Sequence, residues 1–481
     1  MLFNSKVFII FLTVVLLVYY RLGREAKLWF LLLMSYVFYG FWNPWLCSLI
    51  FLSTVVDYIC ALRIDGSTDK RVRKAWLGVS LGVNLGALGF FKYYNFFIDS
   101  FEFSLAQVGM PIDFAHWHLD LILPVGISFY TFQTLSYTIE VYRGNFKSDR
   151  NFRDFALFVS FFPQLVAGPV ERATHLLPQY KLPFRLTRAQ VYDGVFLILL
   201  GFVKKVVIGD RLAQSIEPFF ANEVSDPAVA WMSIILFTCN IYVDFSAYSD
   251  IAIGLGRLLG YDIRPNFNLP YVVPSIPERW RRWHISMGHW FRDYIYFPLG
   301  GNRKGKTRTL ANIMAVMFLS GLWHGASYNF VFWGVLNGAT MVGHRLLLPV
   351  LKPMAAFFGR TTVTKWAYYY LCCFNTMLMI SWINIFFRSD TWPVAKSYVA
   401  ATLRPWEIID YAMSVSRLPV GYVEGFQMMA LVIVVHELQR WWDVKSKILS
   451  RPWVWAVACA AMYFYVLLYG IKGPEFIYYQ F

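Results

Sequence analysis

Long apolar segments recur along almost the whole chain, and they limit the folds that it can adopt. Hydrophobic residues make up 58% of the sequence and charged residues 15%, whereas soluble proteins carry about 25% charged residues. A chain inside lipid must satisfy its own backbone polar groups, so it crosses as helices or as a closed barrel. The segments lack the alternation over about ten residues that marks lipid-facing strands. We therefore predict an all-α polytopic membrane protein that forms a single integral-membrane domain over residues 1–481.

The basic residues collect in alternate loops between these segments. Lys and Arg are concentrated in residues 21–27, 63–74, 143–153 and 181–188, whereas residues 100–120 and 215–230 contain neither. Because cytoplasmic loops carry an excess of Lys and Arg, we predict that the basic loops face the cytoplasm and that the N-terminus and the C-terminal tail 471–481 lie outside it. The basic, aromatic-rich segment 257–308 is predicted to be cytoplasmic. This distribution accounts for the net charge of +15 without a nucleic-acid partner.

Two apolar stretches do not fit a simple crossing. Residues 155–168 have basic loops on both sides and are interrupted by Pro163 and Gly168. Residues 310–348 also lie between basic residues and are interrupted by Gly321 and Gly325. Irregular backbone at membrane depth is tolerated where it is buried in protein or lines a cavity. We predict re-entrant segments at both places, within a fold of about eleven spans.

His324 lies in the middle of the second stretch, directly after Trp323. A charged group at membrane depth costs about 2.5 kcal/mol or more on insertion scales, so such a residue usually faces a polar cavity or a partner. A neutral imidazole could act there as a general base for acyl transfer. The alternative is a satisfied core histidine. The six cysteines lack metal-ligand spacing, and we predict no metal site.

Two further segments gather polar side chains near the predicted cytoplasmic face. Asp244 and Asp250 could hold arginines, orient a base, or form ion pairs with the basic segment that follows. Arg and Trp alternate in residues 278–296, around His284. Such a cluster can anchor interfacial helices to anionic lipid headgroups. It can also receive a phosphorylated carrier or cofactor.

Several ordered motifs together resemble the membrane-bound O-acyltransferase (MBOAT) family, and within it the bacterial alginate O-acetyltransferase branch. They are Pro124–Phe132, Phe162–Arg172, Asp244–Asp250, Arg281–Ser286, Trp290–Tyr294, Gly300–Arg303 and Gly321–Ala326. The resemblance implies a ring of helices around a central funnel, with His324 as the essential catalytic residue. It also implies that His284 is a second functional histidine. The same resemblance assigns Arg281, Trp283 and Asp293 to the funnel entrance.

The C-terminal residues 476–481 resemble the aromatic tail motif of this branch, in which a tyrosine is proposed to carry the acyl group. Tyr478 is the expected acceptor, although this chain has Tyr479 where the motif tends to have Phe. A phenol has a pKa near 10, so it needs a base such as His324. The alternative is an aromatic belt at the membrane interface.

The resemblance implies transfer of an acetyl group from a cytoplasmic donor, with acetyl-CoA expected and no tightly bound cofactor. A periplasmic SGNH-like acyltransferase and polysaccharide export machinery are the expected partners, in a bacterial inner membrane. The final acceptor would be alginate, cellulose or peptidoglycan. D-alanyl transfer to teichoic acid is an alternative, and a solute transporter is a hypothesis from another class, although no inverted repeat is visible.

Overall fold

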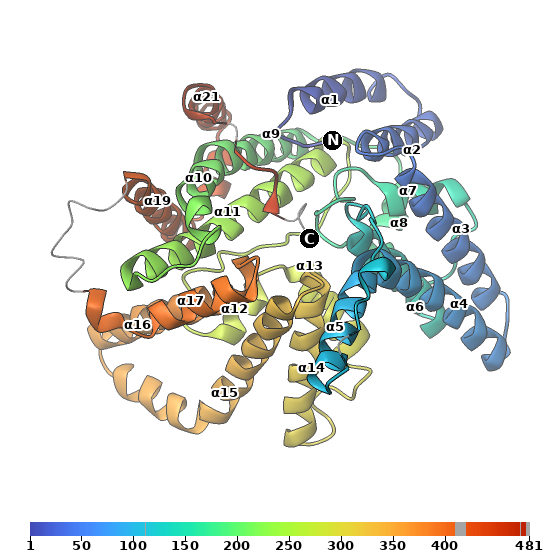
Figure 1. The fold of residues 1–481 in the computed structure, drawn as a ribbon. Helices are drawn as coiled ribbons and strands as arrows, with labels where there is room; N and C mark the ends of the chain where they lie inside the picture. Colours follow the sequence, from blue (N-terminus) through green and yellow to red (C-terminus); the bar gives the residue numbers. More distant parts are fainter. Residues whose placement is uncertain (111, 409–419, 472, 478–481) are drawn as a thin grey trace. The chain divides into compact units, whose positions relative to one another are not determined.

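The computed structural model describes residues 1–110, 112–408, 420–471 and 473–477. Those residues form helices, turns and loops, without a strand in the described ranges, which agrees with the all-α prediction (Figure 1). The chain divides into two compact units, Met1–Gly194 with Ala252–Arg264, and Val195–Ile251 with Pro265–Phe481. The single domain expected over residues 1–481 stays a prediction.

The first unit contains the N-terminal helices. They are α1 (Lys6–Tyr19), α2 (Arg24–Gly40), α3 (Leu46–Asp65), α4 (Lys70–Leu88), η1 (Gly89–Tyr93), α5 (Tyr94–Gln107), η2 (Ala115–Trp117), α6 (Ile127–Arg143), α7 (Phe152–Ser160) and α8 (Ala173–Lys181). The boundary between the units falls within α9 (Arg188–Phe202) and within α11 (Pro227–Leu258).

The second unit contains the remaining helices of the described residues. They are η3 (Val203–Gly209), α10 (Asp210–Phe220), α12 (Ile276–Arg282), α13 (Ile285–Phe291), η4 (Arg292–Tyr296), α14 (Lys306–His324), α15 (Tyr328–Phe358), α16 (Thr362–Arg388), α17 (Trp392–Thr402), η5 (Pro405–Glu407), α19 (Val420–Trp442), α20 (Val444–Leu449) and α21 (Pro452–Tyr469).

Several helices have the length and composition of membrane spans. In the described part of the chain these are the five segments Leu46–Asp65, Lys70–Gln107, Pro227–Leu258, Thr362–Arg388 and Pro452–Tyr469. The count of about eleven spans stays a prediction. The stretch 155–168 begins within the nine-residue helix α7 and continues into a buried turn. At 1.5 Å per residue, α7 is far too short to cross a membrane. This length is compatible with the predicted re-entrant segment.

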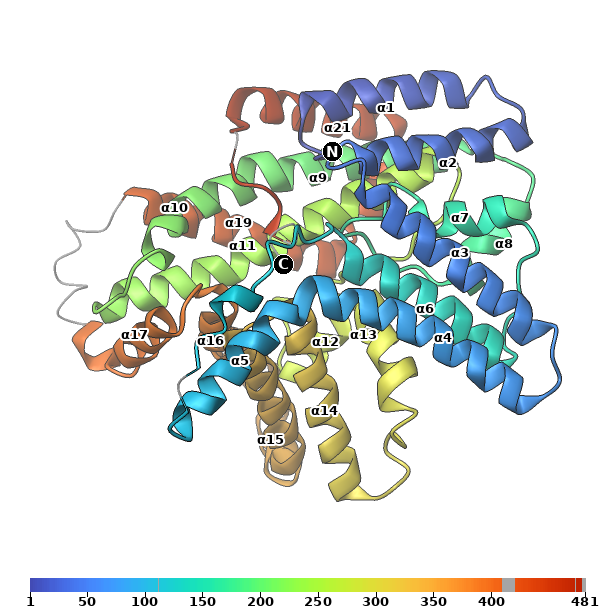
Figure 2. The same cartoon turned by 45° about the vertical axis from the view of Figure 1, so that its right-hand side comes forward.

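A buried polar network joins α3 and α4 of the first unit, which pack together with α6 (Figure 2). The Asp57 carboxylate accepts hydrogen bonds from Ser80 Oγ at 2.5 Å and from Asn84 Nδ2 at 2.9 and 3.0 Å. Ser80 lies within Gly78-Val79-Ser80-Leu81-Gly82, which has the spacing of a hydrolase nucleophile elbow. Such an elbow needs a strand-to-helix turn, whereas Ser80 lies mid-helix and bonds Asp57. Its role is therefore structural.

Helices α14 and α15 of the second unit form a hairpin whose backbones touch (Figure 1). A Cβ atom on Gly321 would lie 2.3 Å from the Phe330 carbonyl oxygen and 2.9 Å from Gly334 Cα. A Cβ atom on Gly325 would lie 2.1 Å from the Phe330 ring. Small residues allow helices to approach this closely in membranes. The hairpin explains why glycines interrupt the apolar stretch on both sides of His324.

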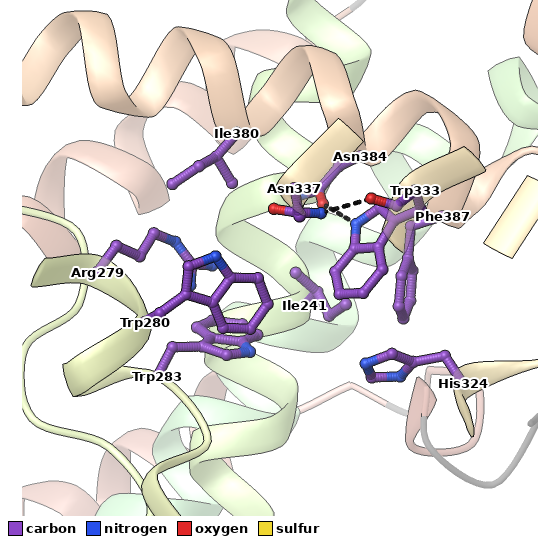
Figure 3. A pocket seen from close by; sticks show the side chains of 10 residues that line it. All are labelled: Ile241, Arg279, Trp280, Trp283, His324, Trp333, Asn337, Ile380, Asn384 and Phe387. Carbon is purple, nitrogen blue, oxygen red and sulfur yellow. Dashed lines mark hydrogen bonds between the residues drawn. The ribbon is translucent and has the colours of Figure 1, made fainter. Parts of the chain in front are cut away.

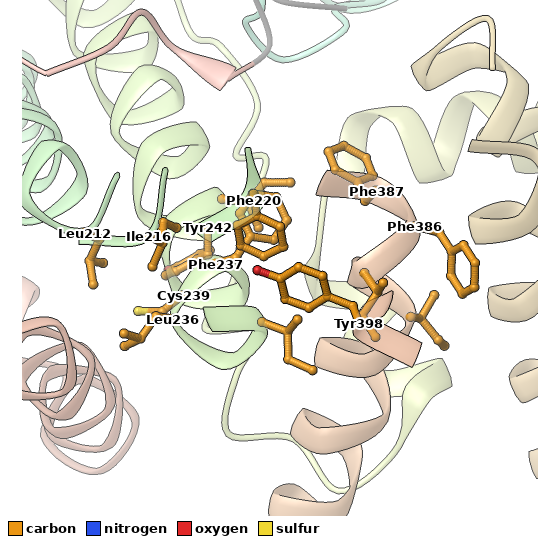
Figure 4. Close-up of a cluster of buried hydrophobic side chains, with 14 of the residues drawn as sticks. Leu212, Ile216, Phe220, Leu236, Phe237, Cys239, Tyr242, Phe386, Phe387 and Tyr398 are labelled. Carbon is orange, nitrogen blue, oxygen red and sulfur yellow. The ribbon is translucent and has the colours of Figure 1, made fainter. Parts of the chain in front are cut away.

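A cluster of buried hydrophobic side chains, several of them aromatic, packs helices of the second unit together (Figure 4). Phe220 and Tyr398 stack with ring centroids 4.8 Å apart and planes 3° apart. The Tyr398 hydroxyl donates to the Phe219 carbonyl at 3.0 Å, so its polar end is satisfied inside the core. Phe387 belongs to the same cluster, and this residue also reaches the ring of His324.

An ion-paired histidine ties α8 to the end of the first unit. His175 Nδ1 lies 2.8 Å from Glu171 Oε2, and its Nε2 lies 3.4 Å from Asp262 Oδ2. Hydrogen bonds to Asp262 and Glu171 raise the pKa of His175 to about 9. The folded structure therefore favours the protonated, positively charged form of His175 at neutral pH.

We predict that the stability of the first unit falls as the pH rises from about 6.5 to 9. The folded pKa of His175 is raised, so its contribution is complete below the ordinary pKa of about 6.5 and is lost as the pH passes 9. Each pH unit in this window withdraws at most about 1.4 kcal/mol. Thermal unfolding of the wild type and of His175→Gln at several pH values measures this difference. Equal pH dependence in the two proteins would contradict the assignment.

Candidate active site

His324 is the last residue of α14 and is enclosed by aromatic rings. Its ring centroid lies 4.9 Å from Trp333 and 5.0 Å from Phe387, both in edge-to-face geometry. Trp323, its neighbour in the chain, lies at 4.6 Å. The side chain is 5% exposed. His324 is therefore deeply buried; that the hairpin is re-entrant stays a prediction.

A small cavity lies on one side of His324 (Figure 3). Its volume is about 20 Å³, which is enough for about one water molecule. Asn337 and Asn384 supply polar groups to its wall. Trp333 Nε1 donates to Asn384 Oδ1 at 3.1 Å, and Asn337 Nδ2 donates to the Trp333 carbonyl at 2.9 Å. These bonds hold the indole in place against His324.

A much larger cavity lies on another side of His324. Its volume is about 950 Å³, at the upper end of the range for small-molecule and cofactor sites. His284 lines this same cavity together with Met317, Ser320 and His324. The structure thus brings the two predicted functional histidines, 40 positions apart in the numbering, to one space.

The two cavities share a wall. Trp280, Trp283 and His324 line both of them. In Figure 3 the two indoles lie across the small cavity from the imidazole of His324. Because His324 borders both spaces, its imidazole can meet a group in the large cavity and a second group in the small one.

The large cavity is positively charged. Arg281, Arg292 and Arg345 line it, and no Asp or Glu is among its described lining residues. Arg281 pairs with Glu278 at 3.0 Å, and Arg292 pairs with Asp293 at 2.8 Å. The predicted entrance residues Arg281 and Trp283 therefore line the cavity, while Asp293 supports a lining arginine.

His284 is held by a residue that the sequence did not single out. Its Nδ1 lies 3.1 Å from Asn266 Oδ1. The same oxygen accepts from the Ser286 backbone N–H at 3.3 Å and from Ser286 Oγ at 2.9 Å. Since a backbone N–H only donates, the Asn266 atom is an acceptor, and His284 Nδ1 carries the proton in the neutral ring. That tautomer leaves the lone pair on Nε2.

The backbone and the charge state of His284 are both unusual. Its φ is 44°, in the left-handed region that is rare for non-glycine residues. Burial lowers the pKa of His284 to about 3. The ring is therefore neutral across the physiological range, and Trp323 packs against it with centroids 5.8 Å apart.

Arg279 is a second residue that the sequence did not single out. It is 4% exposed, lines the small cavity, and places its guanidinium 4.0 Å from the centroid of the Trp283 ring. Arg279 lies on α12, and Trp283 directly follows the last residue of that helix, four positions after Arg279. Arg281, the predicted residue, is exposed on another face. The spacing of four residues between Arg279 and Trp283 was the sequence signal that could have distinguished Arg279 from Arg281.

Asp244 and Asp250 pair with lysines of η3, not with the basic segment that follows them. Lys205 Nζ lies 2.7 Å from Asp244 and 2.9 Å from Asp210. Lys204 Nζ lies 2.6 Å from Asp250. Neither aspartate is among the residues that line the two cavities. The expected arginine or base contacts are therefore not seen for either carboxylate.

The same cluster binds the backbone of the C-terminal tail. Lys205 Nζ donates to the Pro474 carbonyl at 3.0 Å, and Asp244 Oδ2 accepts from the Ile477 N–H at 2.7 Å. Asp210 accepts from the Gly473 N–H at 3.1 Å. Phe476 is 1% exposed and packs under the Lys205 ammonium. The tail is thus anchored up to Ile477; Tyr478, the predicted acyl acceptor, lies outside the described residues.

We predict that Lys205→Met destabilises the protein by about 3–5 kcal/mol, because it leaves Asp210 and Asp244 buried without their cation. The adjacent Lys204→Met is the matched control. The side chains of Lys204 and Asp250, which form its ion pair, are each about one-fifth exposed. We therefore expect Lys204→Met to lower the free energy of unfolding by about 1 kcal/mol or less. Thermal unfolding of the purified proteins in detergent measures both changes, and equal losses would contradict the buried cluster.

Comparison with known proteins identifies the family of the chain. Residues 147–387 match the membrane-bound O-acyltransferase family. The chain is 40% identical over 444 residues to the probable alginate O-acetylase AlgI of Pseudomonas aeruginosa, covering 90% of this chain and 80% of that protein. It is 37% identical over 439 residues to the Pseudomonas putida protein of the same name (90% and 85% covered).

A third relative carries a different name. The chain is 35% identical over 424 residues to the peptidoglycan O-acetyltransferase of Helicobacter pylori, covering 81% of this chain and 77% of that protein. All the residues that line both cavities, Ile241 through Phe387, fall inside the family match. The chain therefore belongs to the membrane-bound O-acyltransferase family and is a membrane acyltransferase.

Proposed function

We propose that the protein transfers an acetyl group from a cytoplasmic donor across the membrane for O-acetylation of an extracytoplasmic polysaccharide. The observation that carries this proposal is the position of His324, which borders both the large basic cavity and the small cavity. The large cavity would receive the donor, and the acceptor hydroxyl would approach His324 through the small one.

Acetyl-CoA is the proposed donor, bound as a substrate and not as a resident cofactor. Its phosphates would meet the arginines at positions 281, 292 and 345, since guanidinium groups suit phosphate recognition. A volume of about 950 Å³ admits the pantetheine arm. Met317 and Met341 give the wall an adaptable apolar surface for that arm.

His324 is the proposed general base. Its imidazole takes the proton of the acceptor hydroxyl while the oxygen attacks the thioester carbonyl. The C–S bond then breaks, the sulfur leaves and receives the proton from the imidazolium, and the acetyl group remains as an oxygen ester. His284 stays neutral with its lone pair on Nε2, so it can accept a proton or a hydrogen bond within the same cavity.

Tyr478 is the proposed first acceptor. The tail contacts of Lys205 and Asp244 hold Ile477 at a fixed place directly before Tyr478, which supports a positioned acceptor. If Tyr478 is the first acceptor, mass spectrometry of the C-terminal peptide should detect an acetyl group on Tyr478. Full activity of a Tyr478→Phe variant would remove Tyr478 from the relay.

Delivery to the polymer requires a further protein. We propose a periplasmic SGNH-like acyltransferase, working with polysaccharide export machinery in the bacterial inner membrane, and alginate, cellulose or peptidoglycan as the acceptor. With this topology the N-terminus and the tail would both be extracytoplasmic. The tail anchored within the same chain favours acetyl transfer over D-alanyl transfer to teichoic acid, where the tail is expected on a separate small protein.

We predict that His324→Gln lowers polysaccharide O-acetylation by at least about 100-fold, the usual contribution of a general base. His436→Gln is the matched control. His436 is a histidine of the same unit that is also 5% exposed, but it bonds the Tyr242 hydroxyl at 2.9 Å and lines neither cavity. We expect His436→Gln to retain acetylation within about threefold, since glutamine can keep this hydrogen bond.

The measurement is the acetyl content of the exported polymer at equal membrane levels of each variant. Wild-type acetylation in His324→Gln would contradict the role of His324 as a base. Loss of polymer export with unchanged acetyl content per residue would instead favour the transporter hypothesis.

A further inference from the structure

A separate cavity in the first unit is lined by cations and aromatic rings. Its volume is about 400 Å³. Arg24, Lys27 and Arg185 line it, whereas its described lining residues include no Asp or Glu. Two of the basic loops, residues 21–27 and 181–188, therefore meet at one cavity.

Lys27 is the most buried of the three cations, at 8% exposure. Its ammonium lies 3.4 Å from the centroid of the Phe184 ring and 4.9 Å from that of Tyr19. In the described part of the chain this ammonium makes no hydrogen bond and no ion pair. Aromatic rings stabilise a cation without neutralising it, so Lys27 keeps its N–H donors and its full charge for a ligand.

The aromatic shelf under Lys27 is held by the backbone around Gly260. Gly260 has φ +84°, and a Cβ atom there would lie 2.7 Å from the Phe184 ring. Glycine thus lets the ring sit against the main chain. The Tyr19 hydroxyl donates to the Leu259 carbonyl at 2.8 Å. Both rings that face Lys27 are therefore fixed in position before any ligand arrives.

The other charges around the cavity also remain available. Arg24 donates to the backbone carbonyls of Tyr180 and Lys181 at the end of α8, which are neutral groups. Arg185 is exposed. The neighbouring carboxylate of Asp262 is already paired with His175 and Arg257.

We propose that this cavity binds the phosphate group of an anionic ligand, and that an anionic phospholipid headgroup is its natural source. Three cations converge without a carboxylate, which is the chemistry that recognises phosphate. Leu28, Leu182 and Pro183 complete the lining and give an acyl chain an apolar surface. Basic pockets in membrane proteins bind anionic headgroups. The proposal is independent of the acyl-transfer site.

The test uses purified full-length protein in neutral detergent. Native mass spectrometry measures the binding of phosphatidylglycerol and of phosphatidylcholine, and thermal unfolding is followed with and without inorganic phosphate. We expect phosphatidylglycerol to bind more tightly than phosphatidylcholine. Lys27→Met, which keeps the aliphatic stem, should weaken phosphatidylglycerol binding about fivefold, the effect of one cation near a headgroup.

Two further variants keep the test decisive. Arg185→Gln changes an exposed side chain, so it should fold normally and give a similar loss even if Lys27→Met folds poorly. Lys74→Met removes an exposed cation of the same unit that does not line the cavity, and it should bind phosphatidylglycerol as the wild type does.

Stabilisation by inorganic phosphate that is lost in the Lys27→Met and Arg185→Gln variants would support the phosphate site and assign it to a soluble ligand. Wild-type lipid binding in both variants, without stabilisation by phosphate, would overturn the proposal. Because the readout is binding and not acylation, failure here is distinguishable from failure of the proposed function.

Discussion

The close approach of α14 and α15 at Gly321 and Gly334 determines where His324 lies. Where the two backbones touch, there is no room for side chains. The last turn of α14, which follows this contact, carries His324 into the protein interior. Trp333 and Phe387 then close around the imidazole. A larger residue at either glycine would separate the helices and withdraw His324 from the two cavities that it borders.

The second unit contains two kinds of charged site, a buried ion cluster and a group of accessible arginines. Lys205 is buried and pairs with two carboxylates, and the three groups together hold the tail backbone. The arginines of the large cavity have at most one carboxylate partner each, and Arg345 is exposed. A buried ion cluster of the first kind fixes structure, whereas cations that stay accessible can receive an anionic ligand. The structure uses the two arrangements at different places.

Much of this could be predicted from the sequence, because membrane folding leaves few choices. Apolar length and Lys/Arg distribution indicated helices, and the interruptions at Gly321 and Gly325 indicated the hairpin. The identity of the contacts could not be predicted. Asn266 reaches His284 across a loop whose course no periodic pattern records.

The pairing of the aspartates shows the same limit. Asp244 was expected to meet the basic segment that follows it, but a π-helical turn at η3 aims Lys205 at it instead. Local irregularities of this kind have no signature in composition. Arg279 is the intermediate case, since its spacing of four residues to Trp283 contained the information.

The most direct test of the central claim is the structure, by electron cryomicroscopy, of the protein bound to a non-hydrolysable acetyl-CoA analogue. The account predicts the analogue's phosphates beside the arginines of the large cavity, with its acyl carbonyl facing His324 and one acceptor oxygen's width away, so that an oxygen bonded to the imidazole would lie within about 3.5 Å of the carbonyl carbon. An analogue bound outside this cavity, or with its acyl end directed away from His324, would contradict the account.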